Sequence, residues 1–226
     1  MIQPNCRARF TAQDFEFVVR VLGRDSQQKV SLVELLTDPE MRDQILDHEK
    51  LCYAILENTG HLTISSQFYF YILARLVMRR AGIEDRTLSD YVAALLERFS
   101  STRELRAPVP EASTTYLSDL LLALKGATAY QAFLIQSHVG NYALFVTGMF
   151  HENIELRRQR GAPSCSYYEE LGRTSFHAAA SHDLAKKFEL GPLFETLADR
   201  FRDCRLALNQ LADELVDLGD HPYNCT

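Results

Sequence analysis

The longest charge-free run of the chain constrains the fold most. Residues 126–150, GATAYQAFLIQSHVGNYALFVTGMF, contain no Asp, Glu, Lys or Arg, although 24% of all residues are charged. The run has 25 residues, which is enough for a helix to cross a bilayer. Its polar side chains would be costly in hydrocarbon; they include Gln131, Gln136, Ser137, His138, Asn141 and Thr147. We therefore predict no membrane association and a helix that other helices cover.

Two small residues in this run indicate where a neighbouring helix packs. Gly140 and Ala143 share one helix face, and neither carries a bulky side chain. Another helix backbone can therefore approach closely there. A helix that is apolar all round belongs in the middle of a bundle. We expect residues 116–150 to form the central helical segment, with a break near Gly140.

The other patterned stretches also have helical period, and none alternates as a strand would. The clearest start lies at Thr11, which can cap a helix with Asp14 in its first turn, while Phe10 can pack on Phe15. Further helices are expected at about 31–36, 38–57, 65–81, 88–99, 165–184 and 194–218. The sequence predicts an all-α fold: one domain over 1–226, a multi-helix bundle of about eight to ten helices around the central apolar segment. A subdomain junction is possible at 101–115, where two prolines occur.

The last predicted helix carries an unbroken apolar seam. Its residues step by three and four, as at the a and d positions of a coiled coil; they are Phe194, Leu197, Phe201, Cys204, Leu208, Leu211, Leu215 and Leu218. One interpretation is a core helix that packs inside a bundle. The other is self-association of two chains through the Phe194–Leu218 seam. The spacing fits both.

Charge and cysteine content limit the partners and the compartment. The net charge of −6 argues against a nucleic-acid binder, whose affinity would come from Lys and Arg on phosphates. The five cysteines are odd in number and contain no C-x-x-C pair, so we expect reduced thiols and a cytoplasmic protein. The N-terminus has no apolar stretch typical of a signal peptide.

Three histidines are the candidate ligand-binding residues. Each falls on the apolar side of a different predicted helix: His48, His138 and His182. Three imidazoles can hold a metal ion, or they can line a polar pocket with Tyr142 and Tyr168. The alternative is that each is a core histidine whose ring nitrogens are hydrogen-bonded within the fold. No dinucleotide, P-loop, nucleophile-elbow or zinc-protease motif occurs, so no cofactor is implied.

Two arginine clusters interrupt the otherwise acidic chain. The first comprises Arg75, Arg79, Arg80 and Arg86, and the second Arg157, Arg158 and Arg160. We expect them to be solvated side chains near helix C-termini, where cations are favoured by the helix dipole.

Three long blocks carry a resemblance to a known group. They are ISSQFYFYILARLVMRRAGIEDRTLSDYVAALLERF (64–99), QSHVGNYALFVTGMF (136–150) and SYYEELGRTSF (166–176). Together they resemble a group of uncharacterised bacterial all-helical proteins, over about residues 10–215. The resemblance implies a bacterial, cytoplasmic helical protein. No activity is assigned to that group, so no functional residue is carried over.

These observations lead to two functional expectations. The first is a non-enzymatic binding or regulatory protein that acts as a homodimer. The second is a helical small-ligand or metal-binding protein, or an enzyme, with a buried histidine-lined pocket.

Overall fold

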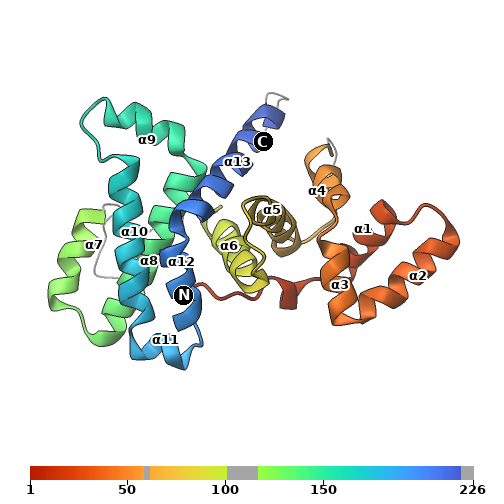
Figure 1. Cartoon of the computed structure of the whole chain (residues 1–226), viewed down its shortest axis with the longest axis horizontal. Helices are drawn as coiled ribbons and strands as arrows, with labels where there is room; N and C mark the ends of the chain where they lie inside the picture. Colours follow the sequence, from red (N-terminus) through yellow and green to blue (C-terminus); the bar gives the residue numbers. More distant parts are fainter. Residues whose placement is uncertain (59–61, 101–116, 220–226) are drawn as a thin grey trace. The chain divides into compact units, whose positions relative to one another are not determined.

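Every regular element that the structure describes is helical (Figure 1). The computed structural model describes residues 1–58, 62–100 and 117–219. The all-α prediction is confirmed. The thirteen described α-helices exceed the eight to ten expected, because short turns divide segments whose apolar pattern is continuous. In chain order the elements are η1 (Arg7–Arg9), α1 (Ala12–Leu22), α2 (Ser26–Thr37), α3 (Pro39–Leu46), α4 (Glu49–Leu56), α5 (Ser66–Arg80), α6 (Arg86–Phe99), α7 (Leu117–Ala123), η2 (Leu124–Gly126), α8 (Ala129–Met149), α9 (His151–Arg158), α10 (Cys165–Ala180), α11 (Asp183–Lys187), α12 (Gly191–Asp199) and α13 (Phe201–Gly219).

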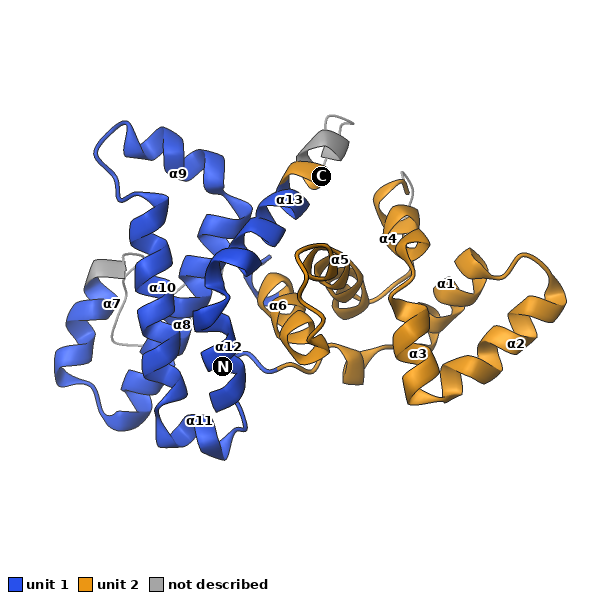
Figure 2. Ribbon diagram, viewed as in Figure 1, with its two compact units in different colours: residues 1–3, 98–212 blue, residues 4–97, 213–226 orange. Residues whose placement is uncertain are grey.

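The chain forms two compact units, which Figure 2 colours separately. Unit 1 comprises residues 1–3 and 98–212, and unit 2 comprises residues 4–97 and 213–226. Cooperative folding as one domain stays a prediction. The expected junction at 101–115 lies outside the described residues.

The charge-free run forms α8, which is largely buried inside unit 1. The helix begins after Thr128, whose side chain accepts a hydrogen bond from the Gln131 amide, while the Gln131 side chain accepts one from the Thr128 amide. The expected break near Gly140 is wrong, because α8 continues through this residue. A glycine inside a helix costs only about 1 kcal/mol, which packing can offset.

The small residues of α8 do mark a close helix contact in unit 1. A Cβ atom on Gly140 would lie 2.8 Å from the ring of Phe176 in α10. On the α10 side, a Cβ atom on Gly172 would lie 3.0 Å from the Cβ atom of Ala143. Figure 1 shows α8 and α10 side by side, and their packing confirms the predicted approach at Gly140 and Ala143.

The buried polar groups of α8 are satisfied by protein atoms. The Ser137 hydroxyl donates to the Phe133 carbonyl at 2.7 Å, and the Thr147 hydroxyl donates to the Ala143 carbonyl at 2.6 Å. Near the end of α8, the Asn209 side chain of α13 donates to the carbonyls of residues 147 and 148. Among the described helices, none has both the length and the apolar character needed to cross a membrane.

The apolar seam is divided between α12 and α13, which are separated at Arg200. Six seam residues are buried within the single chain; they are Phe194, Leu197, Phe201, Cys204, Leu208 and Leu211. Leu215 is half-buried, and the side chain of Leu218 lies outside the described residues. Packing inside the chain therefore accounts for these six residues without a second copy.

In unit 2, α1 starts as predicted. Thr11 and Asp14 form a reciprocal capping pair, and the rings of Phe10 and Phe15 meet edge-on with their centroids 6.3 Å apart. Asp14 is fully buried, and it also accepts hydrogen bonds from the backbone amide and the hydroxyl of Ser65, each at 2.7 Å. One carboxylate thus ties the starts of α1 and α5 together.

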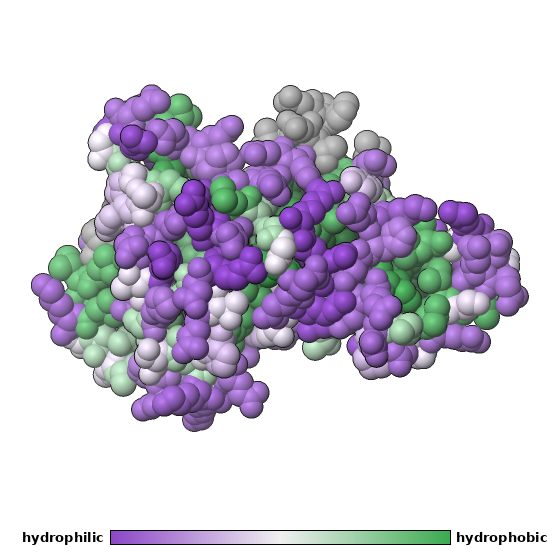
Figure 3. Space-filling model, viewed as in Figure 1, coloured by the Kyte–Doolittle hydropathy of each residue, from purple (hydrophilic) through white to green (hydrophobic). Residues whose placement is uncertain are grey.

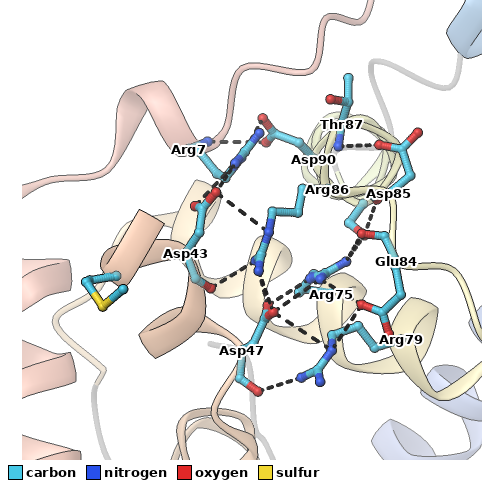
Figure 4. A network of polar contacts seen from close by, with 12 residues as sticks. Arg7, Asp43, Asp47, Arg75, Arg79, Glu84, Asp85, Arg86, Thr87 and Asp90 are labelled. Atoms are coloured by element: carbon cyan, nitrogen blue, oxygen red, sulfur yellow. Dashed lines mark hydrogen bonds and ion pairs between the residues drawn. The ribbon is translucent and has the colours of Figure 1, made fainter. Parts of the chain in front are cut away.

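The first arginine cluster corrects our expectation of a solvated face. The Arg75 side chain is only 2% exposed, and it donates to both carboxylate oxygens of Asp47. Arg86 also donates to both oxygens of Asp47, and Arg79 donates to its backbone carbonyl (Figure 4). The sequence does not reveal the pairing of Arg75 with Asp47, because Asp47 lies 28 residues before Arg75. Asp47 therefore fastens the end of α3 to α5 and α6.

Candidate functional site: a pocket in unit 1

Two of the three candidate histidines begin helices. The Nδ1 atom of His48 accepts a hydrogen bond from the Lys50 amide at 3.2 Å, and the side chain is exposed at the start of α4. The expectation that His48 faces a core is wrong, because the predicted helix is divided at this residue. The Nδ1 atom of His182 accepts from the Leu184 amide at 3.1 Å at the start of α11.

The third histidine, His138, lies inside unit 1 as expected. It is 9% exposed, and its ring centroid lies 5.8 Å from that of Phe99 and 6.4 Å from that of Tyr142. His48 belongs to unit 2, whereas His138 and His182 belong to unit 1. In the part of the chain that the structure describes, no three His, Cys, Asp or Glu side chains are grouped so that they could hold a metal ion.

The two candidate tyrosines, in contrast, line one pocket of about 340 Å³ in unit 1. This size lies within the usual range for small-molecule sites. Four segments contribute to its lining: the last half of α8, α9, the turn that follows, and the start of α10. The lining residues are Tyr142, Phe145, Val146, Phe150, Asn153, Ile154, Arg157, Ala162, Pro163 and Tyr168.

A glycine turn joins α9 to α10 beside the pocket. Gly161 has φ +88°, a left-handed conformation that side chains disfavour, and the Ala162 amide donates to the Arg157 carbonyl at 3.2 Å. The turn directs Ala162 and Pro163 back towards the pocket. Ser164 then caps α10 by accepting a hydrogen bond from the Tyr167 amide, which places Tyr168 in the first turn.

Aromatic rings form one wall of the pocket. Phe145 meets Phe150 edge-on with their centroids 5.5 Å apart, and it meets Phe99 in the same way at 5.2 Å. Phe99 in turn contacts His138. His138 therefore supports this wall from behind and is not among the lining residues.

The polar groups of the pocket lie on α9 and α10. Arg157 carries the only formal charge among the lining residues, and Asn153 supplies an amide one turn earlier. Burial raises the pKa of the Tyr168 phenol, as does the nearby Tyr142, while the Arg157 guanidinium lowers it in part. Arg157 therefore lies close enough to the ring of Tyr168 to influence its ionisation.

A second cavity, of about 510 Å³, lies in unit 2 between α1 and α2. Its lining combines apolar with charged side chains and includes Phe15, Val19, Val33, Leu36, Glu16, Arg20 and Lys29. Figure 3 shows hydrophobic side chains gathered on the visible face near these helices. The two cavities provide a natural comparison, because the lining of this one lacks tyrosines.

Most of the pocket residues were not identified from the sequence, although Tyr142 and Tyr168 were. Arg157 was assigned to a solvated basic turn, and no local pattern distinguishes it from its neighbours Arg158 and Arg160. Phe145 shares a predicted helix face with Tyr142 and His138, which was the available signal. The contributions of α9 and the following turn depend on how the chain reverses at Gly161.

Comparison with models of known protein families, with curated proteins and with solved structures finds no match to this chain. This result is consistent with the resemblance to a group that has no assigned activity.

Proposed function

We propose that the protein is a non-enzymatic binding protein whose unit 1 takes up a small molecule with an apolar body. The observation that carries the proposal is the pocket itself, which combines aromatic rings with a few polar groups. This composition is typical of small-molecule sites, where apolar contacts supply affinity and polar groups fix the orientation.

The architecture of the pocket supports a stable binding site. Phe145 and Ile154 are 6% and 5% exposed, so the apolar floor is held by the core of unit 1. The rim, by contrast, presents Phe150, which is 45% exposed. A ligand that covers this ring removes apolar surface from water, which favours binding.

Fluorescence of the neutral probe N-phenyl-1-naphthylamine tests the proposal with the full chain. We expect saturable binding to the unaltered protein. Ala162→Trp places a large ring in the pocket lining and should weaken binding at least about tenfold, because the space is filled. Val146→Phe is a second filling variant, and circular dichroism checks that each variant remains helical.

The matched control fills the other cavity. Val33→Trp adds the same ring between α1 and α2, and it should leave the affinity for the probe unchanged. Absence of saturable binding would contradict the proposal. Loss of binding in Val33→Trp, with binding retained in both pocket variants, would indicate that the probe binds the cavity of unit 2.

Self-association through the Phe194–Leu218 seam and a cytoplasmic location stay predictions. Since six seam residues are already buried within one chain, a dimer would have to use other surface or the end of α13. Light scattering at micromolar concentration distinguishes a monomer from a homodimer. The absence of nucleic-acid binding also stays a prediction from the net charge.

A further inference from the structure

The charge of the pocket lining indicates the kind of ligand it takes. Arg157 is its only charged side chain, and the lining includes no carboxylate. The other polar side chains there, those of Asn153, Tyr142 and Tyr168, can donate hydrogen bonds. A positive charge beside several donors favours an anionic group in the ligand.

Arg157 differs from the adjacent Arg158 in its ion pairing. Arg158 donates to Glu155 at 3.0 Å, so its charge is already paired. Within the described ranges, no carboxylate lies within ion-pair distance of the Arg157 guanidinium. Its charge is therefore available to a ligand, whereas that of Arg158 is shared.

The position of Arg157 also fits an amphipathic ligand. Arg157 is an exposed residue in the same lining as Tyr168, while Phe145 and Ile154 are buried. A molecule with one charged end can therefore keep that end at the rim and its apolar part against the rings. A planar guanidinium suits oxyanions, because it offers two parallel N–H donors.

From this geometry we infer that the ligand is a small amphipathic monoanion: one carboxylate-like group, held by Arg157, on a compact aromatic body that packs against Tyr142, Phe145 and Phe150. The inference rests on the proposed binding function and adds the charge of the ligand and the residue that recognises it.

Two fluorescent probes with the same aromatic framework test the inference. One is 8-anilinonaphthalene-1-sulfonate, which is anionic; the other is neutral N-phenyl-1-naphthylamine. We expect Arg157→Gln to weaken binding of the sulfonate about tenfold or more, because a charged hydrogen-bond partner is removed. The same variant should change the affinity for the neutral probe by less than about twofold, since the apolar contacts remain.

Arg158→Gln is the matched control, because it makes the same substitution on the adjacent residue of α9. It should leave both affinities unchanged. Equal losses of sulfonate binding in the two variants would overturn the inference and indicate attraction by the basic surface alone. Unchanged sulfonate binding in Arg157→Gln would also overturn it, while the proposed function would stand if the neutral probe still bound. If neither probe bound the unaltered protein, the proposed function itself would fail.

Discussion

At the scale of single residues, Asp47 holds the most connected position in unit 2. Its carboxylate accepts hydrogen bonds from Arg75 and Arg86, as Figure 4 shows. Arginines and carboxylates are equal in number in this network; its members are Arg7, Arg75, Arg79, Arg86, Asp43, Asp47, Glu84 and Asp90. The network therefore needs no external ion for charge balance, and we assign it a structural role.

Asp47→Asn should destabilise the protein by about 3 kcal/mol or more, because it leaves the buried charge of Arg75 with only the exposed carboxylate of Glu84 as an ionic partner. Urea denaturation followed by circular dichroism measures this change. Asp183→Asn is the control, since the same substitution there removes only an exposed pair with Lys186. A loss under about 1 kcal/mol in Asp47→Asn would show that the network contributes little.

The same carboxylate predicts a pH dependence. Burial raises the pKa of Asp47, but hydrogen bonds from Arg75 and Arg86 outweigh this effect and bring the pKa below the usual 3.8. A lowered pKa stabilises the fold above the unfolded-state value, and this stability is lost as the pH falls through the folded-state value. We therefore expect the urea concentration at the unfolding midpoint to decrease as the pH is lowered below about 4. This decrease should be less steep in Asp47→Asn.

Asp90 opposes this trend and must be considered in the same titration. Burial raises its pKa above the usual value, although hydrogen bonds from Arg7 lower it in part. Its protonation therefore favours the folded state as the pH decreases. The difference between the unaltered protein and Asp47→Asn isolates the contribution of Asp47. Parallel pH profiles for the two proteins would contradict the assigned role.

At the scale of helices, the close packing of α10 against α13 and α8 depends on missing side chains. Gly172→Ala should lower stability by about 1–3 kcal/mol, because the new Cβ atom would lie 2.4 Å from the ring of Phe201. This loss outweighs the gain of about 1 kcal/mol that alanine brings to a helix interior. Thermal unfolding by circular dichroism measures the difference.

Gly126→Ala is the control for this substitution. A Cβ atom there meets no other atom within 4 Å, and its backbone is not left-handed, so we expect no loss of stability. Equal effects of the two substitutions would mean that the packing of Phe201 and Ala143 around Gly172 adapts freely to added volume.

The helices also show what the sequence could and could not predict. The apolar run and the Thr11–Asp14 cap are local patterns, so the burial of α8 and the start of α1 were predicted. The continuity of α8 through Gly140 was not. The division of the seam at Arg200 was missed, because the seam continues with the same spacing on both sides. Likewise, the spacing of His48 fits the apolar face of the predicted helix, although in the structure this residue is the N-cap of α4. Apolar spacing identifies a face but does not reveal a change of helix direction.

The pocket illustrates the remaining difficulty. Tyr142 and Tyr168 were chosen from helix faces, and they do meet in one lining. Arg157 could not be chosen, because its proposed role depends on the pairing of Arg158 with Glu155 and on the turn at Gly161. Such distinctions come from tertiary contacts between segments and have no local sequence signal.

At the scale of the whole molecule, the described cysteines are free thiols in both units. Burial raises the pKa of Cys6, Cys52 and Cys204 from 9.0 to about 12. At pH 8 this leaves on the order of a thousandth of the usual thiolate fraction, and the thiolate is the reactive form. We expect these three thiols to resist iodoacetamide in the folded protein and to react once urea unfolds it.

Mass spectrometry of peptides from a Cys225→Ser variant measures the labelling without a contribution from the last cysteine. Cys165 is half-buried and serves as the internal comparison, so it should react faster than the other three. Rapid labelling of Cys204 under native conditions would contradict the tight packing of the seam in unit 1. Rapid labelling of Cys6 or Cys52 would contradict the packing of unit 2.

The most direct test of the account locates a bound ligand on the molecule. Methyl NMR spectra of the full chain, recorded during titration with 8-anilinonaphthalene-1-sulfonate, report on both cavities at once. Val146 and Ile154 line the pocket of unit 1, and Val33 lines the cavity between α1 and α2. We predict saturable shifts of the Val146 and Ile154 methyl signals with little change at Val33. Shifts confined to Val33, or no saturable shift at Val146 and Ile154, would contradict a binding site in unit 1.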